Sequence, residues 1–202
     1  MNEVTELVFG TGNKAKIRQV QDALGEDFVV RGVNDFSVDT DIVEDGTTAQ
    51  ENAKKKSVAY AKALGRTVFS MDNALYFKGV VDSDQPGLYV RRIGGIERSS
   101  DQEMVDSYAE LVKRYGNQLE GWWEYGLSIA RPDGESVEGS IISPRLFVAK
   151  QSDAIVPGYP LESIQIDPQT GRYISEMSSE EQAIFWQQTI GESLNKFIRT
   201  NL

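Results

Sequence analysis

The residues best suited to chemistry lie in one stretch, from Val43 to Phe77. Its front is acidic, with Glu44 and Asp45 ahead of Gly46, and a lone Asp72 stands near its end. A lysine-rich segment separates them, so acid and base meet only if the chain folds back on itself. Carboxylates hold divalent cations, and ammonium groups hold phosphates. The stretch therefore predicts a site for a metal ion and a phosphate.

Two elements must position these groups. Thr48 offers an N-cap oxygen, Glu51 follows as in a capping box, and Gly65 stands where a left-handed C-cap belongs, which together predict a helix. The β-prone run over residues 67–71 then predicts a short buried strand, and residues 74–77 predict another. Ligands of open α/β sheets bind at the carboxyl ends of strands, so Asp72 is well placed for chemistry.

A second candidate site lies near the beginning of the sequence. A strand over residues 3–10, followed by Thr11-Gly12-Asn13 and a helix, predicts a turn of the kind that binds phosphate. Lys16 lies one turn into that helix, where it could reach the same anion. The pattern is weak, because a plain turn with a solvated lysine explains it more often.

Composition restricts both the class of protein and its chemistry. With 202 residues and 40% hydrophobic content, the chain can bury the core of one globular domain. The formal net charge of -10 argues against nucleic acid as a partner. The sequence has no cysteine and no histidine, so catalysis would use carboxylates, lysines, tyrosines or a metal with oxygen ligands. We see no signal peptide or membrane span and expect a cytoplasmic protein.

The remaining segments predict elements that pack rather than react. They are a strand over residues 28–30, a helix over residues 99–115, a hairpin of residues 121–131 and 136–142, and a final helix from Ser178 or Ser179. Residues 78–95 predict a long loop that holds two arginines. The alternation of strands and helices predicts an α/β fold.

Four segments in register resemble the Ham1 family of inosine and xanthosine triphosphate pyrophosphatases. They are TGNKAK at residues 11–16, ENAKKK at residues 51–56, DNAL at residues 72–75 and PGLYVRR at residues 86–92. The resemblance implies a single two-lobed α/β domain over residues 1–202, with a central mixed β-sheet flanked by helices. It also implies a homodimer and a hydrolysis of nucleoside triphosphates to monophosphate and pyrophosphate that needs Mg²⁺ or Mn²⁺.

The same resemblance assigns roles to the residues at matching positions. Glu44 and Asp72 would bind the metal, and together with Lys16 they would carry catalysis. The residues that would contact the substrate are Thr11, Gly12, Asn13, Lys16, Lys56, Asn73, Arg92 and Tyr159. A triphosphate carries about four negative charges, so carboxylates beside it need a divalent cation between them and the phosphates.

Several positions depart from the family pattern, mostly at the end that reads the base. Gln19 and Met71 replace acidic residues, and Gln182 replaces a lysine. Trp186-Gln187-Gln188 stands where the family has Ser-His-Arg, so we expect an altered preference among noncanonical or modified nucleotides. Two alternatives stay open: a nucleotide-binding pseudoenzyme or regulatory dimer that has lost catalysis, and a protein-binding face formed by the tryptophans.

Overall fold

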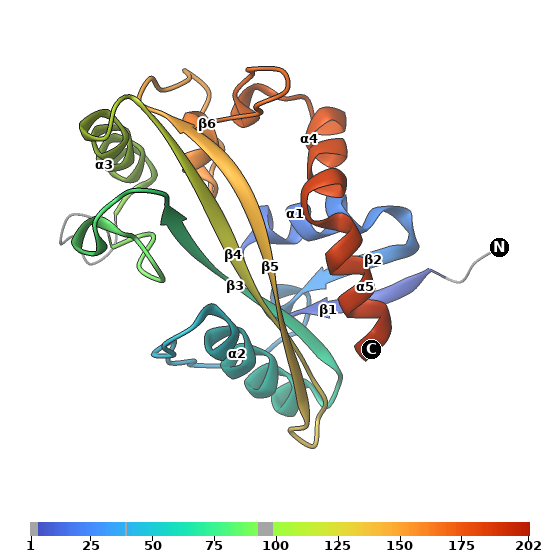
Figure 1. The fold of residues 1–202 in the computed structure, drawn as a ribbon. Coiled ribbons are helices and arrows are strands. Elements are labelled where there is room, and N and C mark those ends of the chain that lie inside the picture. Colours follow the sequence, from blue (N-terminus) through green and yellow to red (C-terminus); the bar gives the residue numbers. More distant parts are fainter. Residues whose placement is uncertain (1–3, 39, 93–98) are drawn as a thin grey trace. The chain divides into compact units, whose positions relative to one another are not determined.

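A mixed six-stranded β-sheet is the main feature of the fold, and the computed structural model describes residues 4–38, 40–92 and 99–202 (Figure 1). The strand order is β2-β1-β3-β4-β5-β6. β1 pairs in parallel with β2 and β3, whereas β6 pairs antiparallel with β5. The expected α/β class is confirmed. The strands are β1 (Thr5–Phe9), β2 (Phe28–Gly32), β3 (Val68–Phe77), β4 (Gln118–Ala130), β5 (Ser136–Val148) and β6 (Gln165–Ile166).

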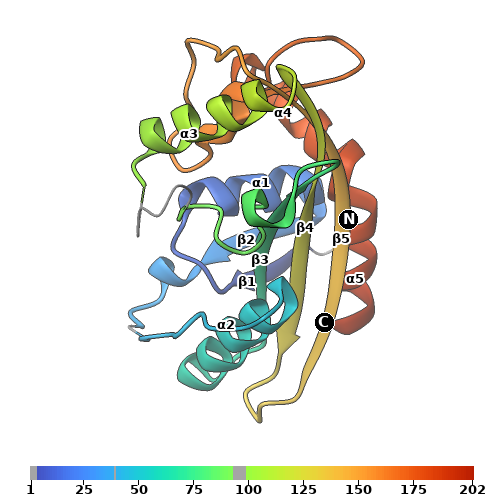
Figure 2. The same cartoon turned by 60° about the vertical axis from the view of Figure 1, so that its left-hand side comes forward.

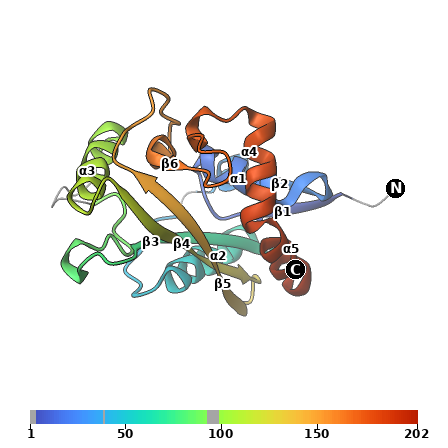
Figure 3. The ribbon, with the colours of Figure 1, turned by 45° about the horizontal axis from the view of Figure 1, so that its top comes forward.

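Helices flank the sheet. They are α1 (Lys14–Leu24), α2 (Ala49–Leu64), α3 (Asp101–Arg114), α4 (Ser179–Trp186) and α5 (Glu192–Asn201). The expected final helix is present as α4 and α5, which follow one another in Figure 3. A π-helical turn, Gln187–Gly191, lies between them. None of the helices within the described residues is both long enough and apolar enough to cross a bilayer.

The chain forms two compact units. The first unit contains Met1–Asn73, Tyr125–Ile141 and Ala183–Leu202, and the second contains Ala74–Glu124 and Ile142–Gln182. Aromatic side chains fill both cores: Phe9 and Phe69 pack with ring centroids 5.1 Å apart in the first unit. In the second unit, the rings of Phe77 and Phe147 pack edge to face at 4.9 Å. That the whole chain acts as a single domain stays a prediction.

β3 differs from its prediction. It runs without a break from Val68 to Phe77, so the prediction of two short strands was wrong, and Asp72 lies in mid-strand rather than at a carboxyl end. Asp and Asn are poor strand formers, which is why Asp72-Asn73 reads as a break in the sequence. β3 lies between β1 and β4 in the sheet, with Phe9 of β1 opposite Phe69 before the two polar residues and Gly87 opposite Leu75 after them, so its length depends on partners far away in the sequence.

Local helix signals are confirmed. The Thr48 side chain accepts a hydrogen bond from the Glu51 N–H at 3.1 Å, and Gly65 ends α2 in the left-handed conformation with φ 63°. Of the hairpin strands, β4 begins at Gln118 rather than at residue 121, and β5 continues to Val148 rather than ending at residue 142. The predicted long loop over residues 78–95 is described only as far as residue 92, and its remainder lies outside the described residues.

Candidate functional site

Four charged side chains of the first unit converge on one point. The Lys56 Nζ atom lies 2.8 Å from Asp72 Oδ1 and 3.0 Å from Glu44 Oε2. The Lys16 Nζ atom lies 3.9 Å from the same Asp72 oxygen. The structure therefore brings together the two predicted metal ligands and the two predicted phosphate-binding lysines. Their formal charges sum to zero.

The position of Glu44 follows from a set of nested contacts between the acidic loop and the beginning of α2. The Thr47 N–H donates to Glu51 Oε2 at 2.6 Å, and the Gly46 N–H donates to Asn52 Oδ1 at 2.8 Å. One step outward, Asp45 pairs with Lys55, and Glu44 then pairs with Lys56. The loop thus folds back along its own helix. Glu51 also accepts from the Thr47 hydroxyl, and hydrogen bonds from the Thr47 and Thr48 backbone help to lower the pKa of its carboxyl, in line with the predicted capping box.

Lys56 is the most enclosed member of the cluster. Its side chain is 10% exposed, that of Asp72 is 14% exposed and that of Glu44 is 48% exposed. Burial lowers the pKa of Lys56, but the carboxylates of Asp72 and Glu44 raise it by more, so its pKa lies above the usual value. The ammonium therefore stays charged at physiological pH.

The predicted phosphate turn is present at residues 11–13, but part of its donor set is already in use. The Thr11 N–H donates to the Phe9 carbonyl, and the Asn13 N–H donates to Thr11 Oγ1 at 3.2 Å. Asn13 caps α1 by accepting from the N–H groups of Ala15 and Lys16. Fewer backbone N–H groups are left for an anion than a free turn would offer. The binding of a phosphate here would therefore depend more on the Lys16 side chain.

Gly12 has a partner that the sequence did not reveal. The Asn34 Nδ2 atom donates to the Gly12 carbonyl at 3.2 Å, and a Cβ atom on Gly12 would lie 2.9 Å from Asn34 Oδ1. The two residues are 22 positions apart, and no motif joins them. Asn34 thereby holds the turn that carries Thr11 and Asn13.

The two positions that lack the family's acids are occupied by buried side chains. Met71 is 1% exposed and belongs to the core. Gln19 is 3% exposed, and its Nε2 donates to the Tyr125 hydroxyl at 3.4 Å. Asn73 neighbours Asp72, but successive strand residues face opposite ways, so it shares a face with Met71. Its Oδ1 is buried and accepts no hydrogen bond within the described residues.

Arg92 and Tyr159, the other predicted substrate contacts, belong to the second unit. The Arg92 guanidinium lies 5.4 Å from the centroid of the Tyr89 ring. The neighbouring Arg91 is the more strongly anchored arginine, since it binds Asp101 Oδ1 at 3.0 Å and the Gly158 carbonyl at 3.3 Å. Arg91 therefore fixes the backbone next to Tyr159, a role that the motif alone did not reveal.

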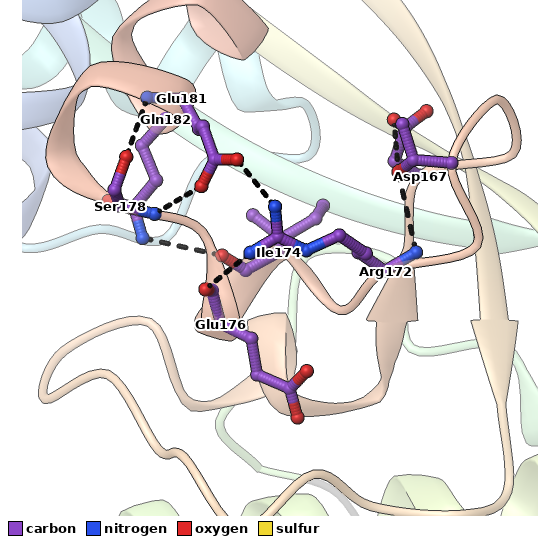
Figure 4. Close-up of polar contacts among 8 residues, drawn as sticks. Asp167, Arg172, Ile174, Glu176, Ser178, Glu181 and Gln182 are labelled. Carbon is purple, nitrogen blue, oxygen red and sulfur yellow. Dashed lines mark hydrogen bonds and ion pairs between the residues drawn. The ribbon is translucent and has the colours of Figure 1, made fainter.

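Gln182, where the family has a lysine, donates to the Ile174 carbonyl at 3.3 Å (Figure 4). Arg172 supplies the nearby positive charge, but it is bound to Glu181 Oε1 at 2.5 Å and to the Glu176 carbonyl at 3.0 Å. Glu181 also accepts from the Ser178 N–H at 2.7 Å. This part of the second unit is therefore an internally satisfied network.

The segment that replaces the family's Ser-His-Arg lies at the join of α4 and α5. Trp186 is 5% exposed and packs edge to face on Phe185, with ring centroids 5.0 Å apart. Gln187 and Gln188 are exposed and lie in the π-helical turn. Trp186 thus fills the core, and the exposed polar groups here are neutral amides.

The donor set in the cluster fits a divalent cation with hard oxygen ligands. Glu44 and Asp72 turn carboxylate oxygens toward one cationic centre, and Mg²⁺ is commonly bound by one or two carboxylates, waters and substrate phosphates. Over residues 4–38, 40–92 and 99–202, no three acidic, histidine or cysteine side chains gather as a larger ligand set. The residues therefore fit a metal whose coordination is completed by phosphate and water.

Comparisons with known proteins agree with this fold and donor set. The model of the Ham1 family matches residues 7–184. A dITP/XTP pyrophosphatase of Staphylococcus aureus (strain MRSA252) is 28% identical over 179 residues, 87% of each chain. One of Shouchella clausii is 33% identical over 103 residues, 51% of this chain and 50% of that protein.

Solved structures show the same fold. The S. aureus Ham1 protein has a TM-score of 0.70 at 24% identity, covering 97% of this chain and 99% of that one. A HAM1 protein from Coxiella burnetii has a TM-score of 0.69 at 20% identity, with the same coverage.

Proposed function

This chain belongs to the Ham1 family, and we propose that it is a nucleoside triphosphate pyrophosphatase that releases a nucleoside monophosphate and pyrophosphate. The observation that carries the proposal is the convergence of Glu44 and Asp72 with Lys16 and Lys56. Two carboxylates and two ammonium groups around one point suit the hydrolysis of a polyphosphate. The names of the curated relatives support the same reaction class.

In this proposal, each residue of the cluster has a distinct task. Asp72, with Glu44 beside it, accepts a hydrogen bond from the attacking water and orients it toward the α-phosphorus atom. Lys16 and Lys56 stabilise the negative charge that develops on the departing pyrophosphate. Thr11, Gly12 and Asn13 hold the phosphate chain at the beginning of α1. Asn73 of the first unit, and Arg92 and Tyr159 of the second, are proposed as further substrate contacts.

Mg²⁺ or Mn²⁺ is part of the proposal, with Glu44 and Asp72 as its protein ligands. When bound, the ion would polarise the phosphoryl oxygens and screen the carboxylates from the triphosphate. Gln19 and Met71 add no charge to the donor set, so two carboxylates are all that we assign to the metal. We therefore expect weaker metal binding than a set with more acids would give.

Base preference is proposed to differ from that of the named relatives. Gln182, Gln187 and Gln188 are neutral, whereas the family pattern has lysine, histidine and arginine at these positions. Neutral amides can donate to and accept from a base edge but do not attract an anionic purine such as xanthine. We therefore propose a noncanonical or modified nucleotide as the substrate and expect XTP to lose any advantage over dITP.

The experiment is a product analysis with Mg²⁺ and a panel of triphosphates that includes dITP, XTP, dUTP and the standard nucleotides. The expected products are monophosphate and pyrophosphate in equal amounts, with the highest kcat/KM on a noncanonical or modified base. Diphosphate and phosphate as products would contradict the proposed reaction. Hydrolysis that persists in the metal-free protein with excess chelator would contradict the proposed metal.

A nucleotide-binding pseudoenzyme is the second candidate. Gln19 replaces an acidic residue of the family pattern, and Gln182 replaces a lysine. Both positions therefore lack a charge that the family pattern carries, which favours this candidate. Measurable binding of triphosphates together with no product from any of them would select this alternative.

The proposal also includes a homodimer in the cytoplasm, with neither nucleic acid nor membrane as a partner. The dimer rests on the resemblance to the family, and the absence of nucleic acid rests on the net charge of -10. Light scattering coupled to gel filtration tests the dimer. A mass of 22.5 kDa in solution, the mass of one chain, would contradict it.

A further inference from the structure

Lys56 occupies the position between the two carboxylates. Three consecutive lysines lie on α2, and they point in different directions. Lys54 pairs with Glu138 at 3.2 Å and is 50% exposed, and Lys55 pairs with Asp45 and is 41% exposed. Lys56 is 10% exposed and contacts both predicted metal ligands. Lysine side chains are rarely enclosed unless they are paired, and of these three lysines only Lys56 is enclosed.

The contacts that hold Lys56 are the contacts that a metal ion would need. The ammonium has three hydrogen atoms to donate, and two of its acceptors are Glu44 Oε2 and Asp72 Oδ1. A divalent cation bound by the same carboxylates would lie next to a positive charge in a poorly solvated place. Like charges in such a place repel strongly. Lys56 and a metal ion therefore compete for one pair of carboxylates.

The net charge of the cluster indicates what would relieve the competition between Lys56 and the metal ion. The four side chains are neutral together, so a divalent cation alone would leave the cluster with a charge of two. A pyrophosphate or triphosphate supplies negative charge that can pair with both the ammonium and the metal. Glu44 is about half exposed and Asp72 is enclosed, so the Glu44 contact is the one that can open at low cost.

We propose that Lys56 is a resident cation that holds Glu44 and Asp72 in place before the metal arrives and makes metal binding depend on the phosphate chain. Without nucleotide, Lys56 occupies the carboxylates and metal binding is weak. When the phosphate chain enters, the ammonium turns to the phosphate oxygens and the carboxylates become available. This inference rests on the proposed metal and phosphate site, and Lys56 acts in it as a positioning residue as well as a phosphate contact.

The test measures binding and needs no turnover. Isothermal titration calorimetry measures Mg²⁺ binding to the nucleotide-free protein, and then the binding of pyrophosphate at saturating Mg²⁺. In Lys56→Met, Mg²⁺ alone should bind about tenfold more tightly, because the competing charge is gone. Magnesium pyrophosphate should bind about tenfold more weakly, because a phosphate contact is lost. Opposite changes in the two affinities are the signature of the proposal.

Lys54→Met is the matched control. It removes the same charge from the same helix but leaves the contacts of Lys56 with Glu44 and Asp72 intact, so both affinities should stay within about twofold of the wild type. Lys56→Arg keeps the charge and should keep Mg²⁺ binding weak. Should Lys56→Met fail to fold, Lys56→Gln takes its place, and the rise in melting temperature on adding Mg²⁺ should be larger than for the wild type.

An unchanged or weaker affinity for Mg²⁺ in the Lys56→Met and Lys56→Gln variants would overturn the proposal. Equal tightening in Lys54→Met would also overturn it, since a general charge effect would then explain the result. Neither measurement depends on hydrolysis. A protein that hydrolyses no triphosphate can still pass this test, and an active pyrophosphatase can still fail it.

Discussion

Replacement of Gly126 by alanine tests how closely α2 approaches the sheet. Gly126 lies in β4, and a Cβ atom there would lie 2.2 Å from the Ala49 carbonyl carbon and 2.3 Å from the Gln50 nitrogen. Ordinary contacts of a Cβ atom begin near 3.4 Å. Both contacted atoms are backbone atoms at the beginning of α2, which lies beside the sheet in Figure 2. A methyl group can fit only if α2 retreats by about 1 Å.

The expected losses of stability and of activity in Gly126→Ala follow from that displacement. Overpacking of a close-packed contact costs about 1–3 kcal/mol, and the upper end applies because backbone cannot rotate away. For a chain of this size, 3 kcal/mol corresponds to a melting temperature lower by about 6–12 °C. The moved helix carries Lys56 and the acidic loop with Glu44. A misplacement of about 1 Å in such a cluster lowers kcat by about 10- to 100-fold.

The assay combines thermal unfolding with initial rates on the best triphosphate. Gly139→Ala is the matched control, because its Cβ would meet the Phe197 ring, with Cε2 at 2.8 Å, and a side chain can shift. The control should lose less than about 1 kcal/mol. A Gly126→Ala variant as stable as the wild type, with wild-type kcat, would refute the close approach of α2 and the reasoning built on it.

Two further predictions concern stability. Thr48→Ala removes the N-cap of α2 and should lower the free energy of unfolding by about 1 kcal/mol, while Thr48→Ser should lower it by less than half as much, as measured by urea denaturation; equal losses would mean that the hydroxyl is not the cap. Burial raises the pKa of Asp22, and Arg18 at 3.6 Å offsets this only in part. Because the folded state disfavours the charged carboxylate, Asp22→Asn should stabilise the protein at pH 7 by up to about 1 kcal/mol; this gain should shrink as the pH falls through the raised pKa of Asp22 and should be gone below about 4, where the carboxyl is protonated in the folded and the unfolded states. A gain that grows on acidification would contradict the assigned cause.

Local signals in the sequence were sufficient to predict α2. Thr48 and Gly65 each act within one turn of the helix that they end, so neighbours in the sequence carry the information. β3 could not be predicted in the same way. The partners of β3 on either side of Asp72 and Asn73 are distant in the sequence, as the pairs Phe9 with Phe69 and Leu75 with Gly87 show.

The candidate site was likewise predictable only in part. The residue types that suit a metal and a phosphate, including Glu44 and Asp72, are readable in the sequence. That one lysine nitrogen joins them is not readable, because it depends on how the acidic loop folds back on α2. Gln19 and Tyr125, which are 106 positions apart, are joined only by packing.

The measurement that tests the central claim most directly is the rate of pyrophosphate release by Asp72→Asn with Mg²⁺ and the best triphosphate. Asparagine keeps the size of the side chain and removes the charge that faces Lys56 and Lys16. We predict a rate lower by about 100-fold or more, while Asp22→Asn, the same change outside the cluster, keeps the wild-type rate. An Asp72→Asn variant that is folded and releases pyrophosphate at the wild-type rate would contradict the assignment of the site.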